Sequence, residues 1–166
     1  MVTQSELKSL IRYDPLTGVF TNNMSRSGQV SVGSEIGYYN KKGYLRIILQ
    51  GVDYPAQRLA WLYMTGVYPD KESLNVDHID TDRANYKWDN LRLSDYSQNG
   101  FNQSKRSDNT SGYKGVSWKK SHNKWYARIQ VYGKTKSLGY FDTPEEAHEA
   151  YKQAAIKYHG EFANFG

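Results

Sequence analysis

Side chains that could do chemistry stand at regular intervals in the middle of the chain. Asp77 and His78 are adjacent, and two asparagines, Asn90 and Asn99, follow thirteen and twenty-two positions after Asp77. A histidine with its ordinary pKa of about 6.5 can exchange a proton near neutral pH. An Asp-His pair is common, however. By itself it fits a surface turn or a hydrogen-bonded core histidine as well as an active site.

The elements around these residues predict how they are held. Two strand-like segments are joined by a polar loop and followed by a helical segment that Ser94 or Asp95 could cap: "NVDHIDT" (75–81), "DRANYKWD" (82–89), "NLRLS" (90–94) and "DYSQNGFNQ" (95–103). This order is a ββα unit. Side chains alternate between the two faces of a strand, so Asp77 and His78 can meet one substrate only if the strand ends or twists at the pair.

The segments before this unit are β-rich. A short amphipathic helix with Leu7, Leu10 and Ile11 on one side is expected within 1–12. Turn chemistry at Asp14-Pro15 and Thr17-Gly18 then leads into strand-like sequence. "AQRLAWLYMTG" (56–66) changes to helical spacing, with Gly66 as its stop.

Charge is distributed unevenly along the chain. Residues 1–104 hold eleven basic and eleven acidic residues, whereas 105–166 hold nine Lys and two Arg against six acidic residues, which accounts for the whole net charge of +5. Between positions 105 and 136, Asp108 is the only acidic residue, and the basic residues are interleaved with the aromatic residues Trp118, Trp125 and Tyr126. Such a segment is typical of nucleic-acid binding, although a merely solvated basic face gives the same pattern.

The C-terminal part predicts a sheet with one helix. "YKGVSWKK", "KWYARIQV" and "KTKSLGYF" read as three antiparallel strands joined by short turns. In the second of them, alternation predicts a polar face with Arg128 and Gln130 and a buried face that includes Trp125; Trp118 of the first strand is expected in the core as well. Thr143, followed by Pro144 and Glu146, predicts the start of a helix that ends at Gly160.

The middle of the chain resembles the HNH endonucleases of the homing type, which have a ββα-metal site. The resemblance covers "RLAWLYMTG" (58–66), "VDHIDTDRANYKWDNLR" (76–92) and "SQNGFNQ" (97–103). It implies that Asp77 and Asn99 bind one divalent ion, Mg²⁺ or Mn²⁺, that His78 is the general base, and that Asn90 bridges the loop and orients His78. Many relatives have histidine at the position of Gln57, and the consequence of this departure is open.

The C-terminal segment resembles a second family, the APETALA2/ethylene-response type of DNA-binding domain. The resemblance implies that the sheet lies in the major groove of DNA with the helix packed behind it. The positions that match the DNA-contacting set of this family are Lys114, Ser117, Lys119, Arg128, Gln130, Thr135 and Ser137. Arg92 and Arg83 could contact phosphate or pair with Asp80, Asp82 or Asp89, and we assign Arg92 to DNA.

Together these features predict an α+β protein with an N-terminal β-rich unit, an HNH module, and a three-stranded antiparallel sheet on one C-terminal helix. The expected regions are 1–56, 57–103, a linker at 104–111, and 112–166. The role of 1–56 is left open between DNA contacts and a scaffold for the ββα unit.

The expected function is metal-dependent, site-directed cleavage of double-stranded DNA. The alternative is a non-cleaving DNA-binding regulator with a relic HNH module. A role in RNA binding is disfavoured because the polar sheet face offers no typical pair of stacking aromatics. We expect a monomer, with a dimer as the alternative, and no small-molecule cofactor. The absence of cysteine excludes disulfides and thiolate metal sites. With no signal peptide or apolar run of membrane length, a cytoplasmic protein encoded by a phage or mobile element is expected.

Overall fold

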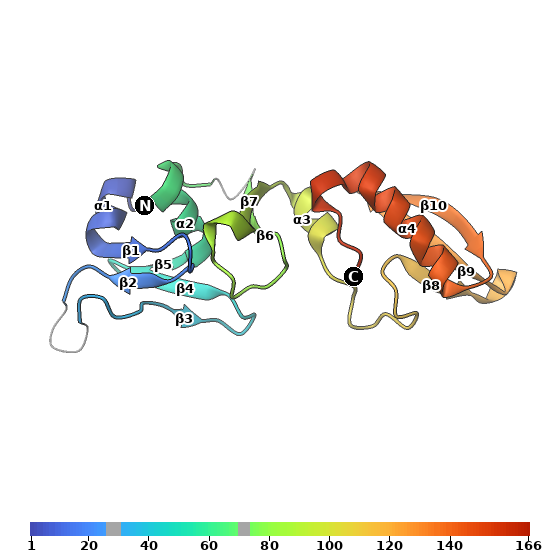
Figure 1. Ribbon diagram of the computed structural model, residues 1–166, viewed down its shortest axis with the longest axis horizontal. Coiled ribbons are helices and arrows are strands. Elements are labelled where there is room, and N and C mark those ends of the chain that lie inside the picture. The colour runs from blue at the N-terminus through green and yellow to red at the C-terminus, as the bar shows by residue number, and fades with distance from the viewer. Residues whose placement is uncertain (26–30, 70–73) are drawn as a thin grey trace. The chain divides into compact units, whose positions relative to one another are not determined.

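The structure, a computed structural model, describes residues 1–25, 31–69 and 74–166. The predicted regions 1–56 and 57–103 include residues outside this description, at 26–30 and 70–73. The chain forms two compact units, Met1–Ser94 and Asp95–Gly166, and each is described by itself (Figure 1). Among the described residues, no helix is both long and apolar enough to cross a membrane.

The first unit opens with a short helix that passes directly into a strand. α1 (Gln4–Leu10) begins at a capping box between Thr3 and Glu6, which satisfies backbone N–H groups at the helix start. It is shorter than the sequence predicted, because Ile11 already has extended backbone angles and belongs to β1 (Ile11–Tyr13). β1 pairs antiparallel with β2 (Phe20–Asn22).

A second sheet and a helix follow in this unit. β3 (Tyr38–Tyr39), β4 (Leu45–Leu49) and β5 (Val52–Pro55) form an antiparallel sheet in that order. α2 (Ala56–Thr65) ends at Gly66, which adopts the left-handed conformation that stops many helices. This is the helix, with its stop, that the sequence predicted.

Two further strands carry the candidate site residues. β6 (Asn75–His78) pairs antiparallel with β7 (Leu91–Ser94), and a turn of 3-10 helix at Trp88–Asn90 precedes β7. One hydrophobic core joins these strands to the N-terminal elements; among its members are Leu7, Phe20, Ile47, Leu59, Val76 and Leu91. The N-terminal region therefore supports β6 and β7 from within the same core.

The second unit begins with α3 (Tyr96–Asn102), for which Asp95 is the N-cap. The strands β8 (Val116–Lys119), β9 (Lys124–Val131) and β10 (Lys134–Phe141) form an antiparallel sheet in the order β10-β9-β8. α4 (Pro144–His159) packs on one face of this sheet. The capping box of Thr143 and Glu146 and the end at Gly160 agree with the sequence.

The core of the second unit lies between α4 and one face of the sheet. Small and aromatic side chains of α4, including Ala147 and Tyr151, pack with Val116, Ala127 and Ile129. The predicted burial of Trp118 is wrong, since this residue is 42% exposed. Trp118 pairs with Trp125 across β8 and β9, and the two rings contact edge to face at 5.1 Å between centroids.

The mixed α+β class is confirmed, with its small antiparallel sheets and the final sheet packed on one helix. The division after Ser94 places α3 with the C-terminal sheet, although α3 is the third element of the predicted ββα unit. The limits of the four predicted regions stay a prediction.

Candidate functional site

The Asp-His pair lies at the last two positions of β6. Burial alternates along this strand, so that Val76 and His78 are buried while Asn75 and Asp77 are partly exposed. The pair therefore follows strand alternation. The strand ends at His78, which is one of the two conditions, an end or a twist of the strand, under which Asp77 and His78 could meet one substrate. Beyond it the chain turns, with Thr81 at φ 66°.

His78 is enclosed by aromatic rings on the buried side of β6. Its exposed fraction is 5%, the edge of its ring meets Tyr86 at 5.1 Å between centroids, and Tyr44 lies 6.2 Å away. Burial lowers the pKa of His78 because the charged imidazolium is poorly solvated there, and the nearby carboxylates of Asp80 and Asp82 oppose this shift. The neutral imidazole, which is the form that can accept a proton, is thus favoured at neutral pH.

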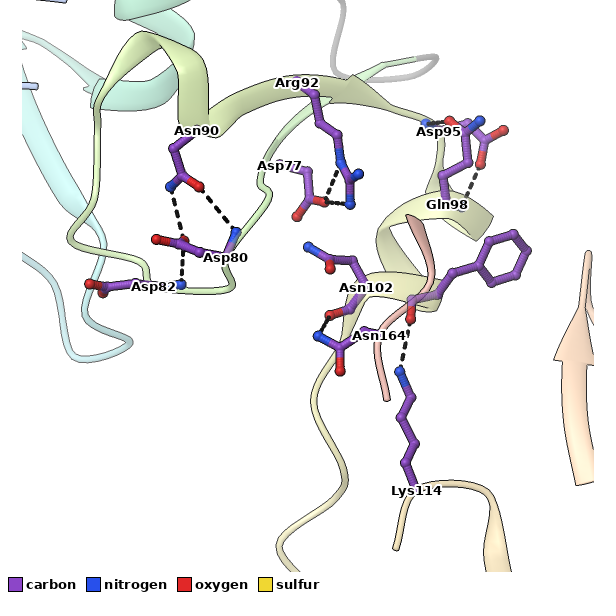
Figure 2. A network of polar contacts seen from close by, with 11 residues as sticks. Asp77, Asp80, Asp82, Asn90, Arg92, Asp95, Gln98, Asn102, Lys114 and Asn164 are labelled. Atoms are coloured by element: carbon purple, nitrogen blue, oxygen red, sulfur yellow. Dashed lines mark hydrogen bonds and ion pairs between the residues drawn. The ribbon is translucent and has the colours of Figure 1, made fainter. Parts of the chain in front are cut away.

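Asp77 lies opposite Arg92 across the β6–β7 pair. Nε and Nη2 of Arg92 are 3.4 and 3.3 Å from Oδ2 of Asp77 (Figure 2). Both distances are long for a charge-assisted hydrogen bond. The sequence had weighed other carboxylates as partners of Arg92, and the structure shows its cross-strand neighbour instead. Contact of Arg92 with DNA stays a prediction.

Asn90 connects the two ends of the loop between the strands. Its Oδ1 accepts from the backbone N–H of Asp80 at 3.1 Å, and its Nδ2 donates to the Asp80 carboxylate at 2.9 Å (Figure 2). Its Nδ2 also donates to the backbone oxygen of Asn85 at 2.9 Å. The backbone oxygen of Asn90 also accepts from Ile79, the residue after His78. Asn90 therefore bridges the loop as expected, while its part in catalysis stays a prediction.

The N-terminal elements hold the same loop from the other side. Tyr13 donates its hydroxyl proton to the backbone oxygen of Tyr86 at 2.7 Å, and the backbone N–H of Leu45 donates to the Tyr86 hydroxyl at 2.6 Å. Gly18, at φ 77°, comes so close that an added Cβ would lie 2.5 Å from the Tyr86 carbonyl carbon. These contacts favour the scaffold interpretation of the N-terminal region.

α2 is fixed to β6 by Arg58. This side chain is buried and donates to Oδ1 of Asn75 at 3.0 Å, two residues before Asp77. Next to it, Gln57 has its Oε1 buried without a hydrogen-bond partner among the described residues. The structure thus shows a positioning role for Arg58 and none for Gln57.

Asn99 lies in α3, within the second unit. The helix is fixed at its start by a capping box, in which Asp95 accepts from the backbone N–H of Gln98 and Gln98 accepts from that of Asp95 (Figure 2). Asn99 is partly buried and lines an open groove of about 860 Å³ together with Arg128, Gln130 and other residues of this unit. Convergence of Asp77 and Asn99 on one ion stays a prediction.

The sheet turns one face away from α4, and we call it the open sheet face. It is made of Ser117, Lys119, Tyr126, Arg128, Gln130, Thr135, Ser137 and Tyr140, which follow one another across β8, β9 and β10 in the observed register. All but Ser117 and Tyr126 are exposed. Six of the seven C-terminal residues predicted to contact DNA thus share this face, which brings together side chains suited to bases and to phosphates.

Lys114, the seventh residue, is placed elsewhere. Its Nζ donates to the backbone oxygen of Phe101 at 2.8 Å (Figure 2) and to that of Gln103 at 2.5 Å. Burial lowers the pKa of Lys114 to about 8. The structure thus shows this amine at the C-terminal end of α3 rather than on the open sheet face.

The sequence reasoning missed an aromatic group on this face. Tyr126 and Tyr140 lie side by side at 5.1 Å, and His122 stacks on Tyr140 at 4.2 Å with its ring plane within 12°. The expectation that the face lacks stacking aromatics is wrong. Alternation had already placed Tyr126 on the polar face, but its neighbour across β10 depends on the bulge between Ser137 and Gly139, which no pattern in the sequence indicates.

Comparison with known proteins finds a family match for the segment that contains the Asp-His pair and another for the C-terminal sheet and helix. Residues 54–101 match the family described as HNH endonuclease, and residues 111–161 match the AP2 domain. Protein 3.8 of Escherichia phage T7 is 36% identical over 90 residues, which are 54% of this chain and 74% of that protein.

Two further similarities extend the comparison. An uncharacterized HNH endonuclease of Acanthamoeba polyphaga mimivirus is 39% identical over 88 residues, which are 53% of this chain but only 44% of that protein. The solved structure of the HNH homing endonuclease I-HmuI, which concerns DNA binding and cleavage by that enzyme, is 20% identical with a TM-score of 0.43, over 90% of this chain and 85% of that one. The chain therefore contains an HNH endonuclease segment at 54–101 and an AP2 domain at 111–161, and it belongs to the same family as protein 3.8 of Escherichia phage T7.

Proposed function

We propose that this chain is a site-directed DNA endonuclease that hydrolyses a phosphodiester bond at the end of β6 and holds its DNA on the open sheet face. The observation that carries the proposal is the position of a buried His78, whose pKa is lowered by burial, next to Asp77 at the end of one strand, within the segment that matches the HNH family.

The ligand chemistry fits a hard divalent ion. Asp77 offers carboxylate oxygens on a side chain that is 10% exposed, and Asn99, which is partly buried, offers an amide oxygen. Mg²⁺ and Mn²⁺ bind to such oxygens while they retain several waters. When bound, the ion would stabilise the negative charge on the phosphate and on the departing 3′ oxygen.

The chain's own residues supply the other steps. His78 accepts the proton of the attacking water, which its neutral form can do at neutral pH. Asn90 maintains the turn that follows His78, and Tyr86 keeps the imidazole in place from the side of the core. Arg92 neutralises Asp77 in the absence of DNA, and in its presence could turn to a phosphate.

Cleavage in the presence of metal tests this proposal. The purified chain is incubated with DNA of the genome that encodes it, with Mg²⁺, with Mn²⁺ or with EDTA, and nicked and cut products are separated on a gel. We expect products only with metal. His78→Ala is expected to lower the cleavage rate by roughly 10²- to 10⁴-fold, the usual contribution of a general base, while gel-shift affinity in EDTA stays unchanged.

His78→Gln is the matched variant, because it fills more of the buried space but is not a base near neutral pH. It should fold and melt closer to the wild type and still fail to cleave. If the wild type produces no nicks with any metal, the enzyme proposal is wrong and the non-cleaving DNA-binding regulator takes its place.

A further inference from the structure

α3 carries Asn99 but is too short to stand alone. It has seven residues, about half of what an isolated helix needs to be even marginally stable in water. Its capping box stabilises only its first turn. What holds its C-terminal end is therefore decisive for the position of Asn99, and those contacts are made within the second unit.

The first anchor is an aromatic stack. The ring of Phe101 lies parallel to that of His159, at 3.9 Å with an angle of 6°, and meets the ring of Tyr132 edge-on at 5.5 Å. His159 is the last residue of α4, and its Nε2 lies 2.8 Å from the backbone oxygen of Gln130 in β9. His159 thus connects α3 to the sheet.

The second and third anchors donate hydrogen bonds to backbone carbonyl groups at the end of α3. The last carbonyls of a helix have no partner inside it, and a positive charge there is favourable. Lys114 donates to the carbonyls of Phe101 and Gln103. Nδ2 of Asn164 donates to the carbonyl of Asn102 at 3.0 Å (Figure 2). Lys114 lies within the AP2 match and Asn164 shortly after it, so each donor comes from the part of the second unit that follows α3, which we call the AP2 unit.

These anchors are themselves tied to the strand that carries the proposed DNA-contacting residues. Lys114 is followed by Gly115, whose backbone oxygen accepts from the N–H of Arg128 at 2.9 Å. Gly115 has φ 76°, and a Cβ there would lie 2.2 Å from the ring of Tyr151, so the chain can approach α4 this closely only with glycine. One anchor thus reaches β9 at Arg128, and the His159 anchor reaches it at Gln130.

We propose that the AP2 unit is also a part of the nuclease site, in which Lys114, His159 and Asn164 are positioning residues that hold α3 and thereby Asn99. This rests on the proposed function, since it takes Asn99 as a metal ligand. It follows that the domain that binds DNA also sets the position of one ligand, and Asn99 shares the open groove with Arg128 and Gln130.

Hydrogen exchange in the full chain tests the anchors without any need for activity. Asn164→Asp keeps the Oδ1 acceptor that receives the N–H of Gly166 at 2.9 Å but loses the donor to α3. We expect exchange in 95–103 to rise about two- to ten-fold, the loss of one net hydrogen bond, with 124–131 unchanged. Tyr113→Phe is the matched control, because it removes a hydrogen bond to Glu145 in the same unit without touching α3.

The stack is tested by a pair of variants at one position. His159→Ala removes both the ring and the contact with Gln130, whereas His159→Phe retains a ring for Phe101. We expect protection of 95–103 to fall in His159→Ala and to be largely restored in His159→Phe. For Asn164→Asp and His159→Ala we also expect weaker Mn²⁺ binding by calorimetry and a lower single-turnover rate, recovered by excess Mn²⁺, with DNA affinity in EDTA unchanged.

The outcomes separate this proposal from the proposed function. If exchange in 95–103 is the same in Asn164→Asp and His159→Ala as in the wild type, the anchors do not hold α3 and the proposal is wrong. If exchange rises but Mn²⁺ affinity does not change, the anchors are purely structural, which also overturns it. If the wild type cleaves no DNA and binds no Mn²⁺, the proposed function is wrong. The proposal that the anchors position Asn99 as a metal ligand is then wrong as well, even if hydrogen exchange shows that they hold α3.

Discussion

At the scale of single residues, Asn90 is the side chain on which the turn after β6 depends. It is 8% exposed and makes three side-chain hydrogen bonds across the turn. We expect Asn90→Ala to lower the free energy of unfolding by about 1–3 kcal/mol, because buried polar groups of the turn lose their partners. We also expect single-turnover cleavage to fall at least ten-fold, measured with saturating DNA.

Asn85→Ala is the control for this change. Asn85 lies in the same loop and donates from its side chain to Asp80, but this contact is exposed. Its loss should cost well under 1 kcal/mol and leave cleavage near the wild-type rate. Equal effects of the two substitutions on cleavage would contradict the particular role of Asn90.

The sequence predicted single residues well where a local pattern determined them and poorly where the register between strands did. The bridging position of Asn90 and the exposure of Arg128 followed from motif and alternation. The pairing of Asp77 with Arg92 depends on which residues face each other across β6 and β7. The exposure of Trp118 depends on the packing of the folded sheet. Neither the register between two strands nor the packing around a side chain can be predicted from a short stretch of sequence.

At the scale of elements, the open sheet face is proposed to provide recognition. Arg128 stands in its middle strand, between Tyr126 and Gln130. We expect Arg128→Ala to weaken specific binding by roughly 5- to 100-fold, since a bidentate contact with a base contributes about 1–3 kcal/mol of discrimination. Single-turnover cleavage at saturating DNA should change much less, because Arg128 is not expected to touch the reacting phosphate.

Lys157→Ala provides the matched loss of charge for Arg128→Ala. Lys157 is exposed in the last turn of α4, which packs on the opposite face of the sheet. It should change affinity for specific and unrelated DNA by no more than about two-fold, because general attraction to phosphates is spread over many basic residues. If gel-shift titrations show the same loss for both variants, or no loss for Arg128→Ala, the open sheet face does not read the sequence.

The elements themselves were largely predictable, but their grouping was not. The cap at Asp95, the stop at Gly66 and the period of two in β9 are local signals, and each element appeared where its signal predicted it. The assignment of α3 to the second unit depends on what buries Phe101. His159 and Tyr132, which do so, lie far along the chain and are marked by no motif.

At the scale of the whole molecule, the net charge is unevenly divided between the parts to which we assign cleavage and DNA binding. The first 104 residues have no net charge and contain all four proposed nuclease residues, while the remaining 62 carry the entire +5. Attraction of DNA is long-ranged and weakened by salt. The basic part should therefore determine how tightly the chain binds, and the neutral part what happens to the bound phosphate.

One Asp-His pair per chain limits what a single molecule can cut. The described residues contain one such pair, and hydrolysis of the two DNA strands needs two attacks on phosphates of opposite orientation. We expect a supercoiled plasmid with a single target site to become a nicked circle, with a rate proportional to the concentration of enzyme. Linear product should appear late, if at all, because a second event needs another molecule bound in the opposite direction.

Gel electrophoresis over a range of enzyme concentrations distinguishes these courses of reaction. A monomer that nicks yields circles first at every concentration, and sequencing of the ends places the nick on one strand. A dimer instead yields linear DNA without accumulation of circles, with a rate that rises with the square of concentration below its dissociation constant. Since the AP2 unit presents one open sheet face per chain, a dimer would also need a target with two-fold symmetry. An asymmetric target that is cut on both strands at once would contradict both courses.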